Sequence, residues 1–320
     1  MNKIMVKSEF APLKKVVVTQ SEFMIPEGMR DTSFLTPEHV ERFLNAGGKS
    51  YGEVFPEEQK RWEKEREELI EVLESYGAEV LRPRLLTDFE KNRDREEGCS
   101  NFFVRDPFFT IGNVLIEGSL RFPYRRNEIL PVRDLIMEEA FKANAMYVAV
   151  PKPDISEGYD SEKGPFLEGG DVLVYNNHVF VGKSGLASND NGYYWLKNLM
   201  EPMGYTVTQV PLKPDVLHLD CAMSLVREGL MIVSEEALLY GVPELFQDWD
   251  KILVKAKEIE YLTINGLPVS EDVYIADIQF KDTVGIELER RGIKVEYLDF
   301  AISRSMGGSF RCSTQALVRD

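Results

Sequence analysis

Residues 168–181 read EGGDVLVYNNHVFV, two apolar segments that flank a polar Asn176-Asn177 pair. Adjacent asparagines between runs of β-branched and other apolar residues are typical of a β-hairpin turn. Downstream, the apolar spacing predicts a helix over Asn191–Gly204, followed by a strand over Tyr205–Val210. This stretch therefore predicts one unit made of a hairpin, a helix and a further strand.

Similar units recur along the chain as a weak internal repeat. Helix and strand pairs are predicted at Glu65–Gly77 with Ala78–Arg82, Val132–Ala143 with Tyr147–Val150, and Val284–Gly292 with Ile293–Tyr297. Further hairpins are predicted at Phe102–Ile116, turning at Gly112-Asn113, and at Ser224–Val233, turning near Glu228-Gly229. Three of the four helices end at a glycine, which favours the left-handed conformation that follows a helix: Gly77, Gly204 and Gly292.

Such units cannot bury their apolar faces singly, so stacking around a common axis is the expected α/β architecture. We count four clear units and a weaker one through Phe246–Ile275. The terminal strands Lys14–Val18 and Gln315–Val318 are expected to close the ring, and Lys152–Pro165 is expected to be a long surface loop. A dinucleotide-binding fold is disfavoured, since no G-x-G-x-x-G follows a strand and opens a helix.

Composition excludes several classes of partner. The 320 residues hold 38 Lys and Arg against 54 Asp and Glu, a formal charge of −16. Such an acidic surface repels phosphate backbones and anionic lipid, so neither nucleic acid nor a membrane is expected as a partner. No signal-peptide core occurs in Met1–Phe10 and no apolar run reaches the ~20 residues of a membrane span.

The cysteines and histidines predict the compartment and the absence of a metal. Three widely separated cysteines, Cys99, Cys221 and Cys312, fit neither a disulfide framework nor a C-x-x-C site, which favours a reducing cytoplasm. With only three histidines, a His-rich metal centre is not expected. Cys99 and Cys221 are expected in the core, Cys221 on the strand face opposite Asp220.

Four polar clusters interrupt otherwise apolar strand segments at a similar place in each unit. They are Arg105-Asp106-Pro107, Glu168-Gly169-Gly170-Asp171, His218-Leu219-Asp220 and Gly307-Gly308-Ser309-Phe310-Arg311-Cys312. Acidic groups in buried segments are costly unless a cation pairs with them. We expect Asp106, Glu168 and Asp220 to hold one guanidinium, whose planar N–H fork suits carboxylates, with Asp171 as support for Glu168.

Cys312 is the expected nucleophile, because Gly307-Gly308 would let backbone approach a ligand closely. A thiolate attacking the guanidino carbon would leave an amidino-cysteine once His218 protonates the departing amine. An amine that clears this intermediate makes the enzyme a transferase, and water makes it a hydrolase. The charged run Glu57–Glu68 is instead expected to be a solvated helix face with i,i+4 pairs Glu57–Arg61 and Lys64–Glu68.

From about Phe102 to the carboxyl end, the chain resembles the pentein superfamily of guanidino-modifying enzymes, and within it the glycine amidinotransferase branch. The resemblance rests on several short motifs in order, which are Arg105-Asp106, Gly112-Asn113-x-x-Ile116-Glu117, Arg125 with Glu128, Ala149-Val-Pro-Lys-Pro153, Phe166-x-Glu168-Gly-Gly-Asp171, His218-x-Asp220 and Gly307-Gly308-x-Phe310-x-Cys312. It implies a five-bladed β/α propeller, a single catalytic domain over residues 1–320, and neither metal nor organic cofactor. It also implies a cysteine-nucleophile role for Cys312, an acid/base role for His218, and carboxylates Asp106, Glu168 and Asp220 around the substrate.

One departure from this branch concerns the guanidino donor. Arginine-using relatives hold the amino-acid carboxylate with an arginine a little beyond the H-x-D motif, where this chain reads Ser234-Glu-Glu-Ala-Leu-Leu-Tyr240. L-Arginine is the expected donor if Arg125 or Arg311 supplies the contact, and a more cationic, agmatine-like donor or a diamine acceptor is the alternative. A guanidino hydrolase and a non-catalytic binding member of the fold are the other functions considered, and a homodimer is expected by resemblance only.

Overall fold

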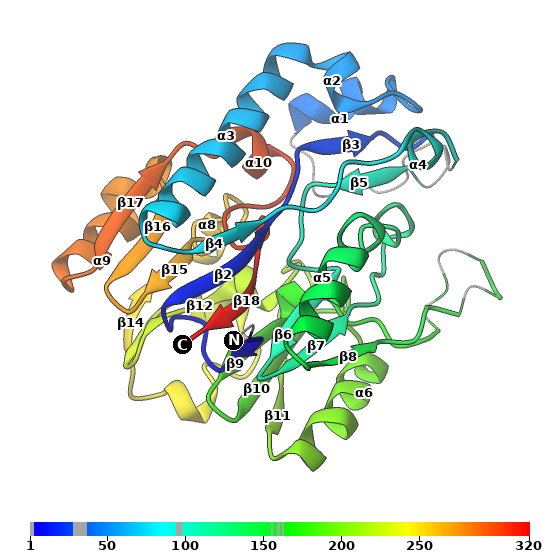
Figure 1. Ribbon diagram of the computed structural model, residues 1–320. Helices are drawn as coiled ribbons and strands as arrows, with labels where there is room; N and C mark the ends of the chain where they lie inside the picture. The colour runs from blue at the N-terminus through cyan, green and yellow to red at the C-terminus, as the bar shows by residue number, and fades with distance from the viewer. Residues whose placement is uncertain (1–2, 28–36, 94–97, 155, 159–160, 162) are drawn as a thin grey trace.

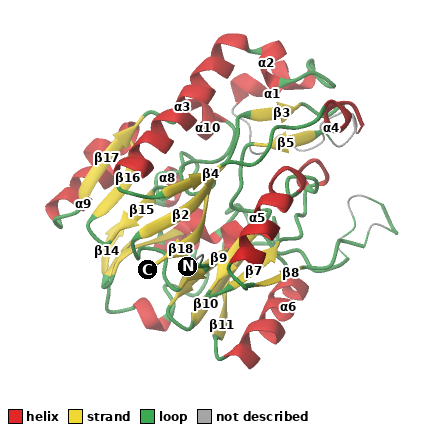
Figure 2. Cartoon of the chain, viewed as in Figure 1, coloured by secondary structure: helices red, strands yellow, loops and turns green. Residues whose placement is uncertain are grey.

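The computed structural model describes residues 3–27, 37–93, 98–154, 156–158, 161 and 163–320. Over these residues the chain forms several small β-sheets with helices placed mostly toward the outside (Figure 1, Figure 2). None of the helices in this part of the chain combines the length and the apolar character that a membrane span requires.

Four three-stranded sheets share one plan, in which two antiparallel strands form a hairpin and the third strand runs parallel to the second. In chain order they are β6 (Phe108–Ile111), β7 (Val114–Glu117) and β8 (Met146–Ala149); β9 (Val172–Tyr175), β10 (His178–Lys183) and β11 (Thr206–Pro211); β12 (Met223–Arg227), β13 (Leu230–Val233) and β14 (Asp250–Leu253); and β15 (Leu267–Ser270), β16 (Val273–Asp277) and β17 (Lys294–Leu298). A parallel third strand needs a crossover connection, which the intervening segments supply.

A fifth sheet joins the two ends of the sequence. Its order is β1–β18–β2–β4, formed by β1 (Met5–Val6), β2 (Leu13–Val18), β4 (Glu79–Leu81) and β18 (Thr314–Arg319). β18 is antiparallel to β2, and β2 is parallel to β4, so this sheet repeats the plan of the others. The predicted pairing of the terminal strands is confirmed, and the N and C labels lie close together in Figure 1.

The four predicted helices are present as α3 (Pro56–Ser75), α5 (Leu130–Lys142), α6 (Asp190–Met200) and α9 (Ile286–Arg290). The described residues also form helices that the apolar spacing did not predict, which are α1 (Pro37–Leu44), α2 (Tyr51–Val54), α4 (Asp88–Arg93), α7 (Leu219–Ala222), α8 (Ala256–Ile259) and α10 (Ala301–Ser305). The three predicted glycines after helices all have positive φ, at 82° for Gly77, 90° for Gly204 and 79° for Gly292. A two-stranded sheet of β3 (Glu22–Met24) and β5 (Cys99–Asn101) lies beside α1 and α2 (Figure 1).

Several boundaries differ from the predictions. The first predicted hairpin begins at Phe108 rather than Phe102, directly after Pro107, which has no N–H to give to a ladder. The weak unit Phe246–Ile275 holds the third strand of one sheet, β14, and the start of the next hairpin. The helix expected from Val284 begins earlier, as a π-helical turn over Lys281–Gly285 that continues into α9. Lys152–Pro165 has no helix or strand among its described residues, as expected.

The charged run on α3 is only partly a solvated face. Lys64 pairs with Glu68 at 2.9 Å, as predicted, but Glu57 pairs with Lys60 rather than Arg61. Glu65 and Arg66 are buried within the same run, where both hydrogen-bond to Ser303. The i,i+4 pattern alone could not distinguish these inward positions, because their partner lies on a distant helix.

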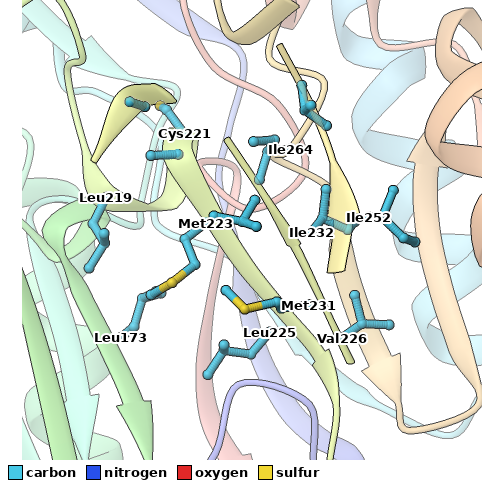
Figure 3. Close-up of a cluster of buried hydrophobic side chains, with 14 of the residues drawn as sticks. Leu173, Leu219, Cys221, Met223, Leu225, Val226, Met231, Ile232, Ile252 and Ile264 are labelled. Atoms are coloured by element: carbon cyan, nitrogen blue, oxygen red, sulfur yellow. The ribbon is translucent and has the colours of Figure 1, made fainter. Parts of the chain in front are cut away.

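The buried apolar residues of the described chain form several separate clusters, and several hairpin strands are buried on both faces. β9, β12 and β13 contribute to one large cluster that includes Leu173, Met223 and Ile232. In Figure 3 the side chain of Met223 extends toward Leu173, while Ile232 and Ile252 lie on the other side of β13. Fully buried strands explain why these segments read as continuous apolar runs rather than as alternating patterns.

A buried ionic cluster around Glu9 ties three parts of this core together. Arg311 Nη2 donates to Glu9 Oε2 at 2.5 Å, and Val174 N donates to Glu9 Oε1 at 2.8 Å. Arg105 Nη2 lies 3.7 Å from Glu9 Oε1. Burial opposes ionisation of Glu9, but the two arginines outweigh it and lower its pKa to about 2.

Replacing Glu9 with glutamine should lower the free energy of unfolding by about 3 kcal/mol, because Arg311 and Arg105 would lose their shared buried counter-charge. Urea unfolding followed by circular dichroism measures the change. Glu287→Gln is the matched control, since Glu287 is ion-paired on the surface with Arg290 and Arg291 and should change stability far less. Equal changes in the free energy of unfolding for the two substitutions would show that the buried Glu9 cluster stabilises the fold no more than a surface ion pair does.

Candidate active site

The segments that precede the first strands of the sheets meet at one cavity of about 370 Å³. Its lining includes side chains from three of the predicted polar clusters, namely Asp106, His218 and Cys312, together with Arg125 and Cys221. Glu168, Asp171 and Asp220 are buried directly behind this lining. The sequence analysis therefore identified groups that the fold brings together.

The polar clusters lie just before strands rather than within them, which corrects the sequence interpretation. Gly169–Asp171 forms a 3₁₀ turn immediately before β9. Leu219–Ala222 forms the one-turn helix α7 immediately before β12, with His218 as its N-cap residue. Cys221 therefore lies on a helix and lines the cavity, although it was predicted to lie on the far face of a strand. Short turns explain the pattern, since they redirect side chains away from the ladder.

Asp106 is held in place by two donors. Its Oδ1 accepts from Gly170 N at 2.9 Å, and its Oδ2 accepts from Arg125 Nη2 at 2.8 Å. A Cβ on Gly170 would lie 2.7 Å from both Asp106 Oδ1 and His218 Nδ1, so only glycine fits between them. Burial opposes ionisation of Asp106, but His218 and Arg125 outweigh it and lower its pKa. Asp106 is therefore a carboxylate at the cavity wall.

Arg125 lines the cavity and is paired with several carboxylates, including Glu168, whose Oε2 lies 3.7 Å from Arg125 Nη1. Its Nε and Nη2 donate to the two oxygens of Glu128 at 2.8 and 2.7 Å, and Nη2 also reaches Asp106. Glu128 accepts a further hydrogen bond from Ser100 Oγ, and burial raises the pKa of Glu128 to about 7. These bonds make Arg125 a support for Asp106.

His218 is a buried histidine among carboxylates. Its Nε2 donates to Glu168 Oε2 at 2.8 Å, and its Nδ1 lies 3.8 Å from Asp106 Oδ1. Burial disfavours the charged ring, but Asp106 and the hydrogen bond to Glu168 outweigh it and raise the pKa of His218 to about 10. The ring is therefore an imidazolium near neutral pH and can donate a proton.

Glu168 acts on this site through His218. Besides His218, its carboxylate accepts from Arg121 N at 2.9 Å, and its own backbone N donates to Ser188 Oγ. Asp171 lies further back, where it accepts from Leu219 N and Ser188 N, and burial raises the pKa of Asp171 to about 7. Asp171 thus fixes the backbone that carries His218.

Cys312 lies at the end of the loop before β18, only 4% exposed. Its carbonyl accepts from Val104 N and Arg105 N, which joins the nucleophile loop to the segment carrying Asp106. Burial, with Asp220 and Asp106 nearby, raises the pKa of the Cys312 thiol well above its ordinary value. The thiol is therefore protonated while the cavity holds no additional positive charge.

Asn265 is a site neighbour that the sequence analysis did not identify. Its Oδ1 accepts from Cys312 N at 3.3 Å and its carbonyl accepts from Arg311 N, while its Nδ2 is buried without a partner. It lies two residues before β15, the same place that the predicted clusters occupy before their strands. That repeated position was the available signal, but the flanking sequence contains no charged or nucleophilic residue that would have drawn attention to it.

Asp220 and Arg311 lie together behind Cys312. Arg311 Nε is 3.5 Å from Asp220 Oδ2, and neither atom has a hydrogen-bond partner. Burial raises the pKa of Asp220, against the opposing effects of Arg311 and His218. Arg311 does not contribute to the cavity lining among the described residues, so it lies away from the position expected of a carboxylate ligand.

The donor atoms of Asp106, Glu168 and His218 lie within 4.8 Å of one another, close enough to share one cation. A metal ion is one cation that such oxygen and nitrogen donors can hold, and a planar guanidinium is another. The absence of a metal stays a prediction.

Comparisons with known proteins show the family of this chain and proteins of similar fold. The sequence model of the family "Arginine deiminase" matches residues 98–259. Inosamine-phosphate amidinotransferase 1 of Streptomyces glaucescens is 24% identical over 98% of this chain and 96% of its own length. SxtG, an amidinotransferase in the saxitoxin biosynthetic pathway of Microseira wollei, has a similar structure, with a TM-score of 0.79, 23% identity and coverage of 99% of this chain and 97% of SxtG. Dimethylarginine dimethylaminohydrolase (DDAH) from Pseudomonas aeruginosa matches with a TM-score of 0.66 at 16% identity, over 95% and 99% of the two chains.

The imidazole of His218 should remain protonated at pH 8 and titrate near pH 10, because carboxylates surround it. Glu168→Gln should lower this pKa by about one unit or more, since it removes the charge that accepts from Nε2. Nitrogen-15 NMR of the three histidines measures both values, with His218→Gln identifying the resonance. A His218 ring that is already neutral at pH 7 would contradict the proposed charge state.

Proposed function

Because the chain belongs to the arginine deiminase family, within the pentein superfamily of guanidino-modifying enzymes, we propose that it is an amidinotransferase. It moves an amidino group from L-arginine or a similar guanidino donor to an amine, through a covalent intermediate on Cys312. The observation that carries this proposal is that a protonated His218 and the Cys312 thiol line one cavity with the carboxylate of Asp106.

Substrate charge accounts for activation of the nucleophile. Burial, together with the nearby carboxyl groups of Asp220 and Asp106, disfavours a thiolate on Cys312 in the free enzyme. A bound guanidinium adds positive charge beside them and favours loss of the thiol proton to solvent water, since His218 is already protonated. The substrate cation thus turns a resting thiol into a nucleophile only when there is a carbon to attack.

The first half-reaction breaks a carbon–nitrogen bond of the donor. The Cys312 thiolate forms a carbon–sulfur bond to the central guanidino carbon, giving a tetrahedral species. His218 gives its proton to the departing nitrogen, the carbon–nitrogen bond breaks, and a neutral amine leaves an amidino group on Cys312. Glu168 keeps the ring oriented throughout, since it holds Nε2.

The second half-reaction reverses these steps with a new amine. The neutral His218 takes a proton from the incoming amine, whose nitrogen attacks the amidino carbon and expels the Cys312 thiolate. Transfer rather than hydrolysis is supported by similarity to amidinotransferases over nearly their whole length. A hydrolase of the arginine deiminase or DDAH type would use the same first half-reaction and water in the second.

The remaining expectations form part of the same proposal. We infer that the five sheets are five blades of a propeller, since they repeat one strand plan and the terminal strands complete the fifth sheet. One catalytic domain follows from the resemblance, and a cytoplasmic location follows from the three cysteines, none of which forms a disulfide. A non-catalytic binding role is disfavoured because a scaffold needs neither the thiol nor the imidazolium, and a homodimer stays a prediction.

Incubation with L-arginine or another guanidine should load Cys312 with one amidino group, and an amine should discharge it faster than water. Intact mass and peptide mapping after an acid quench measure both steps. Cys312→Ala should lose the adduct and lower turnover by about 10⁴-fold or more, whereas Cys99→Ala should keep both. If citrulline or urea-type products formed at the same rate with and without added amine, the transferase proposal would be wrong and the hydrolase would be supported.

The kcat/KM for the donor should rise with pH throughout the neutral and mildly alkaline range, because this quantity reports the free enzyme and burial raises the pKa of its Cys312 thiol well above the ordinary value. It should fall as the pH passes about 10, where His218 loses the proton it must donate. Initial rates at saturating acceptor measure the profile. A rate that is flat from pH 6 to pH 8 would mean that the thiolate exists before the donor binds.

A further inference from the structure

The cavity that contains Cys312 also contains an acidic group, Asp215, that the proposed chemistry does not use. Asp215 is exposed to solvent, unlike the buried Asp106. It occupies the third position of a turn closed by a 3.1 Å hydrogen bond from Val216 N to Lys213 O, with Pro214 in the second position. Proline is favoured there because its φ is fixed, so the backbone that carries this carboxylate has a defined turn conformation beside the cavity.

Much of the rest of the cavity lining is apolar. Phe122 and Tyr124 stack with ring centroids 5.9 Å apart and planes at 24°. Leu186, Leu217 and Met306 also contribute to the lining. A cavity whose lining combines the carboxylates of Asp106 and Asp215 with apolar groups fits a chain of methylene groups that carries a positive charge at each end.

The positively charged residues among the described lining residues are paired with carboxylates. Arg125 bonds to Asp106 and Glu128, and His218 bonds to Glu168. The segment that contacts the Asp215 turn is acidic, since Ala237 O accepts from Lys213 N and is preceded by Glu235 and Glu236, both exposed. Lys213 itself is exposed and does not line the cavity as described, so each cation of the described lining already has acidic partners.

We propose that Asp215 selects a donor whose far end is an ammonium group without a carboxylate, which is a guanidinoalkylamine. This inference rests on the proposed amidinotransferase function and specifies its substrate class. The guanidinium occupies the Asp106 end beside Cys312, the methylenes cross the apolar wall, and the ammonium pairs with Asp215. When the amidino group moves to Cys312, His218 protonates the departing nitrogen and a diamine leaves. The acceptor enters the same space, so diamines fit there as well.

The test compares agmatine, which is L-arginine without its carboxylate, with L-arginine itself. The wild type should show kcat/KM at least about tenfold higher for agmatine. Asp215→Asn should raise KM for agmatine about fivefold, a size typical of one solvent-screened ion pair, while leaving kcat and the KM for L-arginine nearly unchanged. Asp215→Lys should shift the preference toward L-arginine. Asp272→Asn, which removes another exposed carboxylate far from the cavity lining, should change neither donor.

Binding to Cys312→Ala, measured by calorimetry, separates this inference from the function it rests on. Tighter binding of agmatine than of L-arginine, with the agmatine affinity lowered by adding Asp215→Asn, would support the proposed substrate class. If the wild type then formed no amidino adduct on Cys312, that second result would overturn only the amidinotransferase proposal. Preference for L-arginine by the wild type, or an equal response of both donors to Asp215→Asn, would overturn the inference while leaving amidino transfer intact.

Discussion

The buried contact between Glu9 and Arg311 is the constraint on which the arrangement of the site depends. Arg311 precedes Cys312, and Glu9 also binds the backbone of Val174 in β9 and lies near Arg105, the neighbour of Asp106. One carboxylate therefore fixes the nucleophile loop, a neighbouring hairpin and the loop of a substrate-facing acid. Removing a single partner of such a buried pair leaves an uncompensated charge, so the three segments are held in a common geometry.

The same principle of paired burial organises the cavity itself. Asp106 is satisfied by Arg125 and Gly170, and Glu168 by His218 and Arg121. What remains unbalanced is the thiol of Cys312, whose ionisation the surrounding carboxylates oppose. In the proposed mechanism this site gains a nucleophile when a cation enters. Affinity for a guanidinium and activation of the thiol would then be two consequences of one charge distribution.

Much of the fold was predictable from the sequence because its signals are local. The Asn176-Asn177 turn, the glycines after the helices and the apolar hairpins all appear as predicted. The position of the polar clusters was wrong in detail, since a 3₁₀ turn and the one-turn helix α7 are too short to show a period. Asn265 and the inward-facing Glu65 and Arg66 were missed because their partners lie in segments remote in sequence. The roles of the residues around Cys312 stay predictions.

The pairing of β18 with β2 has a consequence for how the protein is made. The strand that follows Cys312 lies against a strand near the other end of the sequence, and Arg311 meets Glu9 across 302 residues. During synthesis β2 lacks its partner until β18 has been made. The proposed catalytic pocket therefore forms only after the segment that carries Cys312 and β18 is available. A cut that removed only the first twenty residues would leave every proposed catalytic side chain in place, yet deprive the nucleophile loop of its anchor.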